Sequence, residues 1–203
     1  MTAMVLTFDM ARECSSPRRV VALDNGGPNR DHAAMKPIES SVEVAAPTAV
    51  VWRVVTDIEN AAKHIPAIRS IEILPGPRSG PGLRWRETRM MFGRTATETM
   101  EIAEWKPPFS HASGGRYVAT ATNHGTFYRS EVRVDPSGTG SRVTFTFEAT
   151  GRTIIARFMT GLMMPLMNRA VVTALSADLR AIKAHCERVA ADEWAAAQEG
   201  REQ

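Results

Sequence analysis

The feature that most constrains the fold is a series of strand-like segments that ends in one long helical pattern. Six segments have the alternation and the bounding turn residues of strands: 68–74, 83–91, 94–105, 109–122, 126–134 and 142–150. Residues 153–197 then carry apolar residues at helical spacing, among them Ala170, Leu175 and Leu179, and only Gly161 and Pro165 interrupt them. We therefore predict an antiparallel meander followed by one long helix, kinked near Pro165, that covers one face of the sheet.

The segment before the meander predicts one further strand and two short helices. Residues 38–44 alternate between apolar and polar side chains and stop at Pro47. A helix follows over residues 49–55, with Thr48 as its N-cap, and a second short helix ends before Pro66. The order strand, helix, helix, six strands, helix predicts an α+β fold with a sheet of about seven strands.

Length and composition favour a single domain with extensions. The chain has 203 residues, and its 43% hydrophobic and 23% charged residues are ordinary for a globular protein. Residues 1–36 show no sustained period, so we expect a poorly ordered extension there. We expect the domain itself over residues 37–190 and a helix end and tail over residues 191–203.

Charge, cysteine and motif content exclude several classes of function. The 25 basic residues are scattered, which does not favour a nucleic-acid partner, and no apolar run is long enough for stable membrane insertion. With no leader pattern and two distant cysteines, we expect a cytoplasmic protein, monomeric or homodimeric, without disulfides. The five histidines lack ligand spacing and nucleotide-binding motifs are absent, so we expect neither a metal nor a cofactor.

The hairpin of residues 83–105 contains the most informative side chains. If Phe92-Gly93 is a two-residue turn, Glu87 lies opposite Glu98, and Arg89 lies on the same face. The face that they share is otherwise apolar and includes Leu83, Trp85, Met100 and Ile102.

Two interpretations of the charged residues on this hairpin remain open. In one, Glu87, Glu98 and Arg89 form a polar end of an apolar cavity and could bind a ligand or transfer protons. In the other, they lie at a hairpin tip in contact with water.

Further candidate residues lie outside the hairpin. Tyr128 could offer its phenol to a ligand or be a core tyrosine, and His64 could be a base in the pocket or a surface or capping residue. We expect an apolar ligand to contact Trp85, Met100, Ile102, Tyr128 and Phe145 of the strands and Phe158, Met159, Leu162 and Met163 of the long helix.

Several short motifs, in this order, resemble one known family. They are Ser41–Pro47, Val51-Trp52, Thr56-Asp57, His64-Ile65-Pro66, Gly82–Trp85, Glu104–Pro108 and Ser141–Thr144. Together they resemble the START-like (Bet v 1-like, SRPBCC) superfamily, in particular its polyketide cyclase/dehydrase and lipid-transport branch. The resemblance covers about residues 37–189 and implies a helix-grip fold, in which a curved sheet wraps around the C-terminal helix. Many relatives have Trp where this chain has His64.

The expected function is the binding, or the binding and transport, of a small hydrophobic molecule between sheet and helix. A lipid, an isoprenoid or a polyketide or other aromatic compound would suit a wall of this composition. The alternative is a cyclase or dehydratase that uses Glu87, Glu98, Arg89, His64 or Tyr128 as acid or base. A third possibility, a protein-interaction module, would require an exposed apolar patch.

Overall fold

The structure is a computed structural model, and it describes residues 37–91, 93–110, 113–123, 125–151 and 154–201. The side chains of residues 154–168 lie outside the description. The chain divides into Met1–Arg30 and Asp31–Gln203, and every described element belongs to the second unit. The expected extension over residues 1–36 lies outside the described residues.

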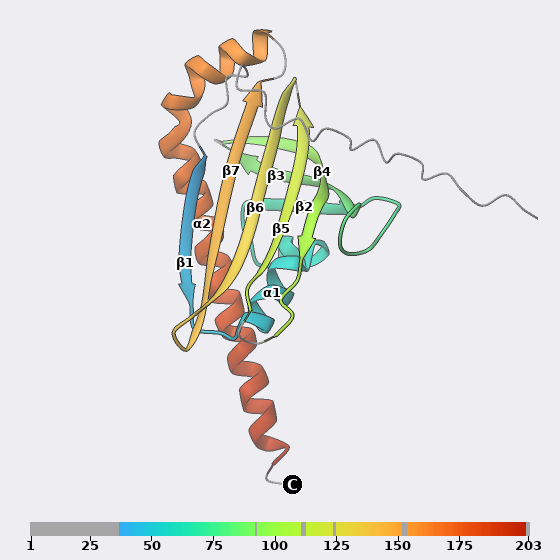
Figure 1. Cartoon of the computed structure of the whole chain (residues 1–203), viewed down its shortest axis with the longest axis vertical. Coiled ribbons are helices and arrows are strands. Elements are labelled where there is room, and N and C mark those ends of the chain that lie inside the picture. Colours follow the sequence, from blue (N-terminus) through green and yellow to red (C-terminus); the bar gives the residue numbers. More distant parts are fainter. Residues whose placement is uncertain (1–36, 92, 111–112, 124, 152–153, 202–203) are drawn as a thin grey trace, which may run out of the picture. The chain divides into compact units, whose positions relative to one another are not determined.

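The elements follow the predicted order. They are β1 (Ile38–Val44), α1 (Thr48–Thr56), the 3-10 helix η1 (Ile58–Lys63), β2 (Ile68–Ile73), β3 (Arg84–Met91), β4 (Arg94–Lys106), β5 (Gly115–Asn123), β6 (Thr126–Ser137), β7 (Gly140–Gly151) and α2 (Ile154–Glu199). The α+β class and the single long C-terminal helix are therefore confirmed. The bend in that helix lies in its N-terminal part, coloured orange in Figure 1.

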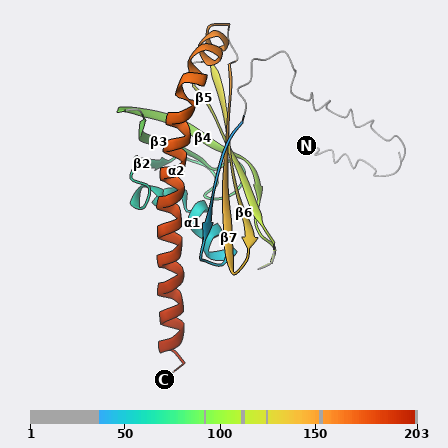
Figure 2. The same ribbon diagram turned by 90° about the vertical axis from the view of Figure 1, so that its left-hand side faces the viewer.

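The described strands form one antiparallel sheet in the order β1-β7-β6-β5-β4-β3-β2. Consecutive strands from β2 to β7 are neighbours, as a meander requires, while β1 joins the far edge beside β7. β6 and β7 run lengthwise and β2 and β3 run across them (Figure 1), so the sheet is strongly twisted and curved. α2 lies along one face of this sheet (Figure 2).

The register of the β3–β4 hairpin is the predicted one. Met91 pairs with Arg94, Glu87 with Glu98, and Trp85 with Met100. Gly93 has a φ of +76°, a conformation that glycine adopts at little cost and that a tight hairpin turn requires.

The two faces of the sheet differ in chemistry. The outer face carries an ion-pair network centred on Glu131, whose carboxylate lies 3.1 Å from Arg116 and from Arg129. The inner face is largely apolar and packs against α1 and α2. Any apolar ligand that binds to the sheet must therefore approach its inner face.

Helix α1 depends on this packing for its stability. Its sequence is rich in β-branched valines, which are weak helix formers, and Val50, Val51, Val54 and Val55 are all buried. Gly115 lets the Trp52 ring approach closely, since a Cβ at this position would lie 2.7 Å from that ring.

Three details of the sequence prediction are wrong. Thr48 is the first helical residue rather than the N-cap, and its hydroxyl lies 3.3 Å from that of Ser141. β5 begins at Gly115 and not at Phe109, which is 92% exposed, because the amides of Phe109 and Ser110 donate to Oγ of Ser113 in a turn rather than to a neighbouring strand. Ala170, expected on the buried stripe of α2, is exposed.

Candidate functional site

A cavity of about 310 Å³ lies between the inner face of the sheet, η1 and α2. Most of its lining is aliphatic or aromatic. The apolar lining residues include Val54, Val55, Ile58, Ile65, Ile68, Ile71, Trp85, Met90, Met91, Met100, Tyr117, Val132, Phe145, Phe147, Val171, Leu175 and Ile182. A wall of this composition suits an apolar molecule, as small-molecule pockets generally do.

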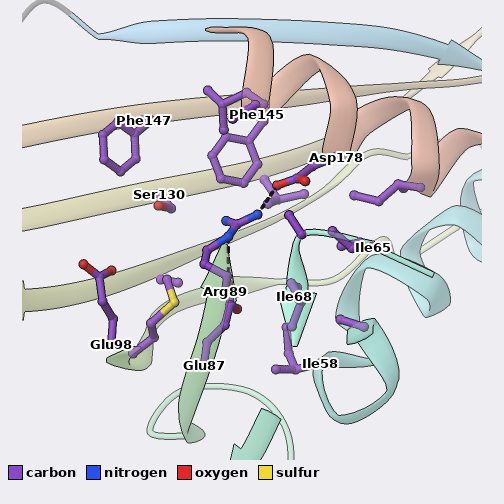
Figure 3. Close-up of a pocket in the computed structure, with 18 of the residues that line it drawn as sticks. Ile58, Ile65, Ile68, Glu87, Arg89, Glu98, Ser130, Phe145, Phe147 and Asp178 are labelled. Atoms are coloured by element: carbon purple, nitrogen blue, oxygen red, sulfur yellow. Dashed lines mark hydrogen bonds and ion pairs between the residues drawn. The ribbon is translucent and has the colours of Figure 1, made fainter. Parts of the chain in front are cut away.

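One region of the cavity wall is charged. Arg89 of β3 reaches across the cavity and donates a hydrogen bond from Nη2 to Oδ2 of Asp178 on α2 (Figure 3). Its Nε also lies 3.5 Å from Oε1 of Glu87, two residues earlier on the same strand. The side chains of Glu87, Asp178 and Arg89 are 12%, 16% and 26% exposed, so this group is covered and is not a solvated hairpin tip.

Burial is the main influence on Glu87. Desolvation raises the pKa of this carboxyl above its usual value, and the Arg89 guanidinium and the Trp85 indole oppose the rise. The negative charges of Asp178 and Glu98 raise the pKa further. Glu87 is therefore easier to protonate than an exposed glutamate and can act as a proton donor or acceptor.

Three further polar side chains line the same region. Glu98 extends from β4, and Ser130 lies on β6 with its hydroxyl directed towards the cavity (Figure 3). Tyr128, also on β6, stacks on Phe147 with ring centroids 5.9 Å apart. Burial raises the pKa of the Tyr128 phenol, so this group stays protonated and can donate a hydrogen bond.

A histidine pair lies at the edge of the cavity where η1 meets α2. The ring of His64, which follows η1, stacks on His185 of α2 with centroids 4.3 Å apart and planes inclined by 4°. Burial lowers the pKa of His64 to about 4, and the nearby His185 and Arg188 contribute to the decrease while Asp57 opposes it. Burial also lowers the pKa of His185. Both rings are therefore neutral and packed together near neutral pH.

The structure brings most of the predicted site residues together. The cavity lining includes His64, Trp85, Glu87, Arg89, Glu98, Met100, Tyr128 and Phe145. Ile102 is an exception: it is 1% exposed and belongs to the core cluster with Leu83 and Val51, outside the cavity lining. The side chains of Phe158, Met159, Leu162 and Met163 lie outside the described residues, so their contribution stays a prediction.

Two residues at this site do not follow from the sequence pattern, and both lie on α2. Asp178 stands three residues after Leu175 and one before Leu179, so it is an acid within an apolar helical stripe. The position of Asp178 in this stripe could have indicated a site residue, because a carboxylate that faces a core needs a hydrogen-bond or ion-pair partner. His185 had no comparable signal, since its contact depends on how α2 is rotated against η1.

Metal chemistry finds no support in the described part of the chain. There, no group of three or more His, Cys, Asp or Glu side chains is arranged to hold a metal ion.

None of the helices in the described part of the chain is long and apolar enough to cross a membrane.

Comparison with known proteins is consistent with this architecture. The family model described as polyketide cyclase / dehydrase and lipid transport matches residues 35–187. No curated protein gives a significant match.

Solved structures share the fold at low sequence identity. The TTHA0849 protein of Thermus thermophilus is 19% identical with a TM-score of 0.60, over 76% of this chain and 99% of that one. A START superfamily protein from Mycobacterium smegmatis is 15% identical with a TM-score of 0.59, over 78% and 99%. The Zhui aromatase/cyclase from Streptomyces sp. R1128 is 22% identical with a TM-score of 0.56, over 75% and 94%. At these identities the likeness shows the helix-grip fold alone.

Proposed function

The chain belongs to the polyketide cyclase / dehydrase and lipid transport family, and from this premise we propose that it binds a small apolar molecule in the cavity beneath α2. The observation that carries the proposal is the lining of isoleucine, valine, methionine and aromatic side chains. Removing apolar surface from water on such a wall supplies about 25 cal/mol per Å². The ligand would be a lipid, an isoprenoid or an aromatic compound of polyketide type.

The proposal is tested by the binding of an uncharged fluorescent dye such as N-phenylnaphthylamine. We expect one dye molecule to bind per chain with a micromolar Kd. The bound dye should quench the fluorescence of Trp85, which lines the cavity and is 3% exposed. The response should be lost in Trp85→Phe and kept in Trp194→Phe, because Trp194 is 68% exposed near the C-terminal end of α2.

A matched pair of substitutions on β4 locates the dye. Ala96 lines the cavity, whereas the adjacent Thr97 is exposed on the opposite face. Ala96→Trp should weaken dye binding on the order of tenfold by filling the cavity, and Thr97→Trp should leave the Kd unchanged. Equal effects of both substitutions would exclude the cavity as the binding site, and mass spectrometry of small molecules extracted from the native protein would identify the natural ligand.

One observation favours a second candidate, a cyclase or dehydratase reaction in the same cavity. Glu87 is a carboxyl with a raised pKa that faces an apolar chamber beside a guanidinium, which is a suitable arrangement for moving a proton at a carbonyl substrate. Turnover of a poly-keto substrate that disappears in Glu87→Gln, but not in the outward-facing Glu101→Gln, would support it. Turnover that survives in Glu87→Gln would remove Glu87 as the acid or base.

A further inference from the structure

The described lining of the cavity contains more acidic than basic side chains. Glu87, Glu98 and Asp178 bring three carboxyl groups to the lining, and Arg89 is the one cation of Lys or Arg type among the described lining residues. Tyr128 and Ser130 add two uncharged hydroxyl groups. A ligand that enters the cavity therefore meets an excess of hydrogen-bond acceptors with negative charge.

The guanidinium of Arg89 nevertheless does not donate all of its possible hydrogen bonds. Arg89 donates from Nη2 to Asp178, while its buried Nε has no hydrogen-bond partner within the described part of the chain. Its Nη1 makes no hydrogen bond or ion pair with the other residues drawn in Figure 3, and the Arg89 side chain is 26% exposed at the cavity wall. One terminal N–H donor of Arg89 therefore stays available at the cavity wall, with Glu87 beside it and Glu98 further along the wall (Figure 3).

From this arrangement, and resting on the proposed function, we propose that the cavity selects an apolar ligand with an uncharged hydroxyl group, an alcohol or a phenol, at the end that reaches Arg89. The oxygen of a hydroxyl accepts a hydrogen bond from Arg89 while its proton is donated to a cavity carboxylate. A single hydroxyl group then pairs with both the free N–H donor of Arg89 and one of the excess carboxylate acceptors.

The charged alternatives satisfy only one of these features. A carboxylate accepts from Arg89, but it brings a fourth acid next to Glu87, Glu98 and Asp178 in a covered site. An ammonium donates to the acids, but it has no lone pair to accept from Arg89 and loses its hydration in a cavity whose wall is mostly apolar. Fatty acids and amines should therefore be poor ligands although their apolar parts fit.

Four probes with the same two-ring body test this selectivity in the full-length protein. They are methylnaphthalene, naphthylmethanol, naphthoate and naphthylmethylammonium, measured by titration calorimetry at pH 7 and constant ionic strength. We expect the alcohol to bind on the order of tenfold tighter than methylnaphthalene, and both ions to bind more weakly than methylnaphthalene.

Two substitutions on β3 assign the effect to Arg89. Arg89→Met should abolish the advantage of the alcohol over methylnaphthalene and improve binding of the ammonium probe. Arg86→Met is the matched control, because Arg86 is exposed on the outer face, where it pairs with Glu72 at 2.5 Å, and there the probe ranking should not change. Should Arg89→Met not fold, the four-probe series on the wild-type protein decides by itself.

The outcomes separate this inference from the proposed function. If methylnaphthalene binds but the carboxylate or the ammonium binds as tightly as the alcohol, the head-group inference is overturned and the apolar cavity stands. If none of the four probes binds, both fail together. An alcohol preference that persists in Arg89→Met also overturns the role given to Arg89.

Discussion

The Glu87 carboxyl is a candidate functional group, and its burial also lowers the stability of the folded protein when it is ionised. Folding moves the Glu87 carboxyl from water to a cavity wall, and the nearby Arg89 compensates only in part, since the net effect is a raised pKa. Because the folded-state pKa exceeds the unfolded value of 4.5, the contribution of Glu87 to stability is full below that value. This contribution is lost as the pH rises through the folded-state pKa.

Glu87→Gln is therefore expected to be more stable than the wild type at neutral pH. Glutamine resembles the protonated form in shape and cannot ionise, so the melting temperature should rise by roughly 2 °C at pH 7. The difference should shrink towards pH 4, where the wild-type carboxyl is protonated as well. Thermal melts at both pH values check this, with the exposed Glu101→Gln as control. A variant that is less stable at pH 7 would show that the ion pair with Arg89 outweighs burial.

His64 has the opposite pH dependence. Its pKa is lowered from 6.5 to about 4, so its contribution to stability is present above pH 6.5 and is lost as the pH falls through 4. In His64→Gln the decrease in melting temperature between pH 6.5 and pH 4 should be shallower than in the wild type. Lys63→Gln, a neighbouring substitution, should follow the wild-type curve. Parallel curves for all three proteins would show that the pKa of His64 is the same in the folded and unfolded states.

At the scale of elements, the attachment of α2 to the sheet determines whether a cavity exists. Leu175, Leu179 and Cys186 are the buried residues of its described inner stripe, and Leu179 belongs to the main core cluster. Polar contacts add to this attachment: Lys183 donates to the Glu43 carbonyl at 2.6 Å, and the Ala45 amide donates to Glu187 at 2.8 Å.

Removing one anchor of α2 is expected to be costly. Leu179→Ala should lower the free energy of unfolding by about 2 to 5 kcal/mol, because it leaves a void where a 3% exposed leucine packs. Arg180→Ala, the exposed neighbour, should change it by less than about 0.5 kcal/mol. Chemical denaturation of the three proteins provides the comparison, and similar values for both variants would mean that α2 is loosely held at this position.

The sequence predicts strand pairing better than helix orientation, for physical reasons. A two-residue turn fixes which residues of β3 and β4 are opposite, so the pattern of side chains alone places Glu87, Glu98 and Trp85 on one face. No comparable local constraint fixes the rotation of a long helix over a sheet. For this reason Asp178 and His185 were missed and Ala170 was placed on the wrong face. Alternation likewise gives the face of Ile102 but not its depth, so this residue was expected in the cavity rather than the core.

At the scale of the whole molecule, we propose that residues 37–190 make up the folding unit and that residues 191–203 form a helix end and tail. A protein that starts at Met35 should keep a cooperative thermal transition within roughly 2 °C of the full chain, because the first described strand begins at Ile38. Loss of cooperativity after this truncation would assign residues 1–34 a part in folding. Scanning calorimetry of both proteins decides.

The position of β1 has a consequence for how quickly this molecule can form. Ile38, at the start of the domain, pairs with Phe147, near the end of the meander, so one edge of the sheet joins segments from opposite ends of the sequence. Such distant pairing is slow, because the entropy of closing a long loop is lost before the contacts form. On the ribosome, β1 must wait until β7 has been synthesised, and the apolar residues of the intervening strands stay accessible to chaperones during that delay.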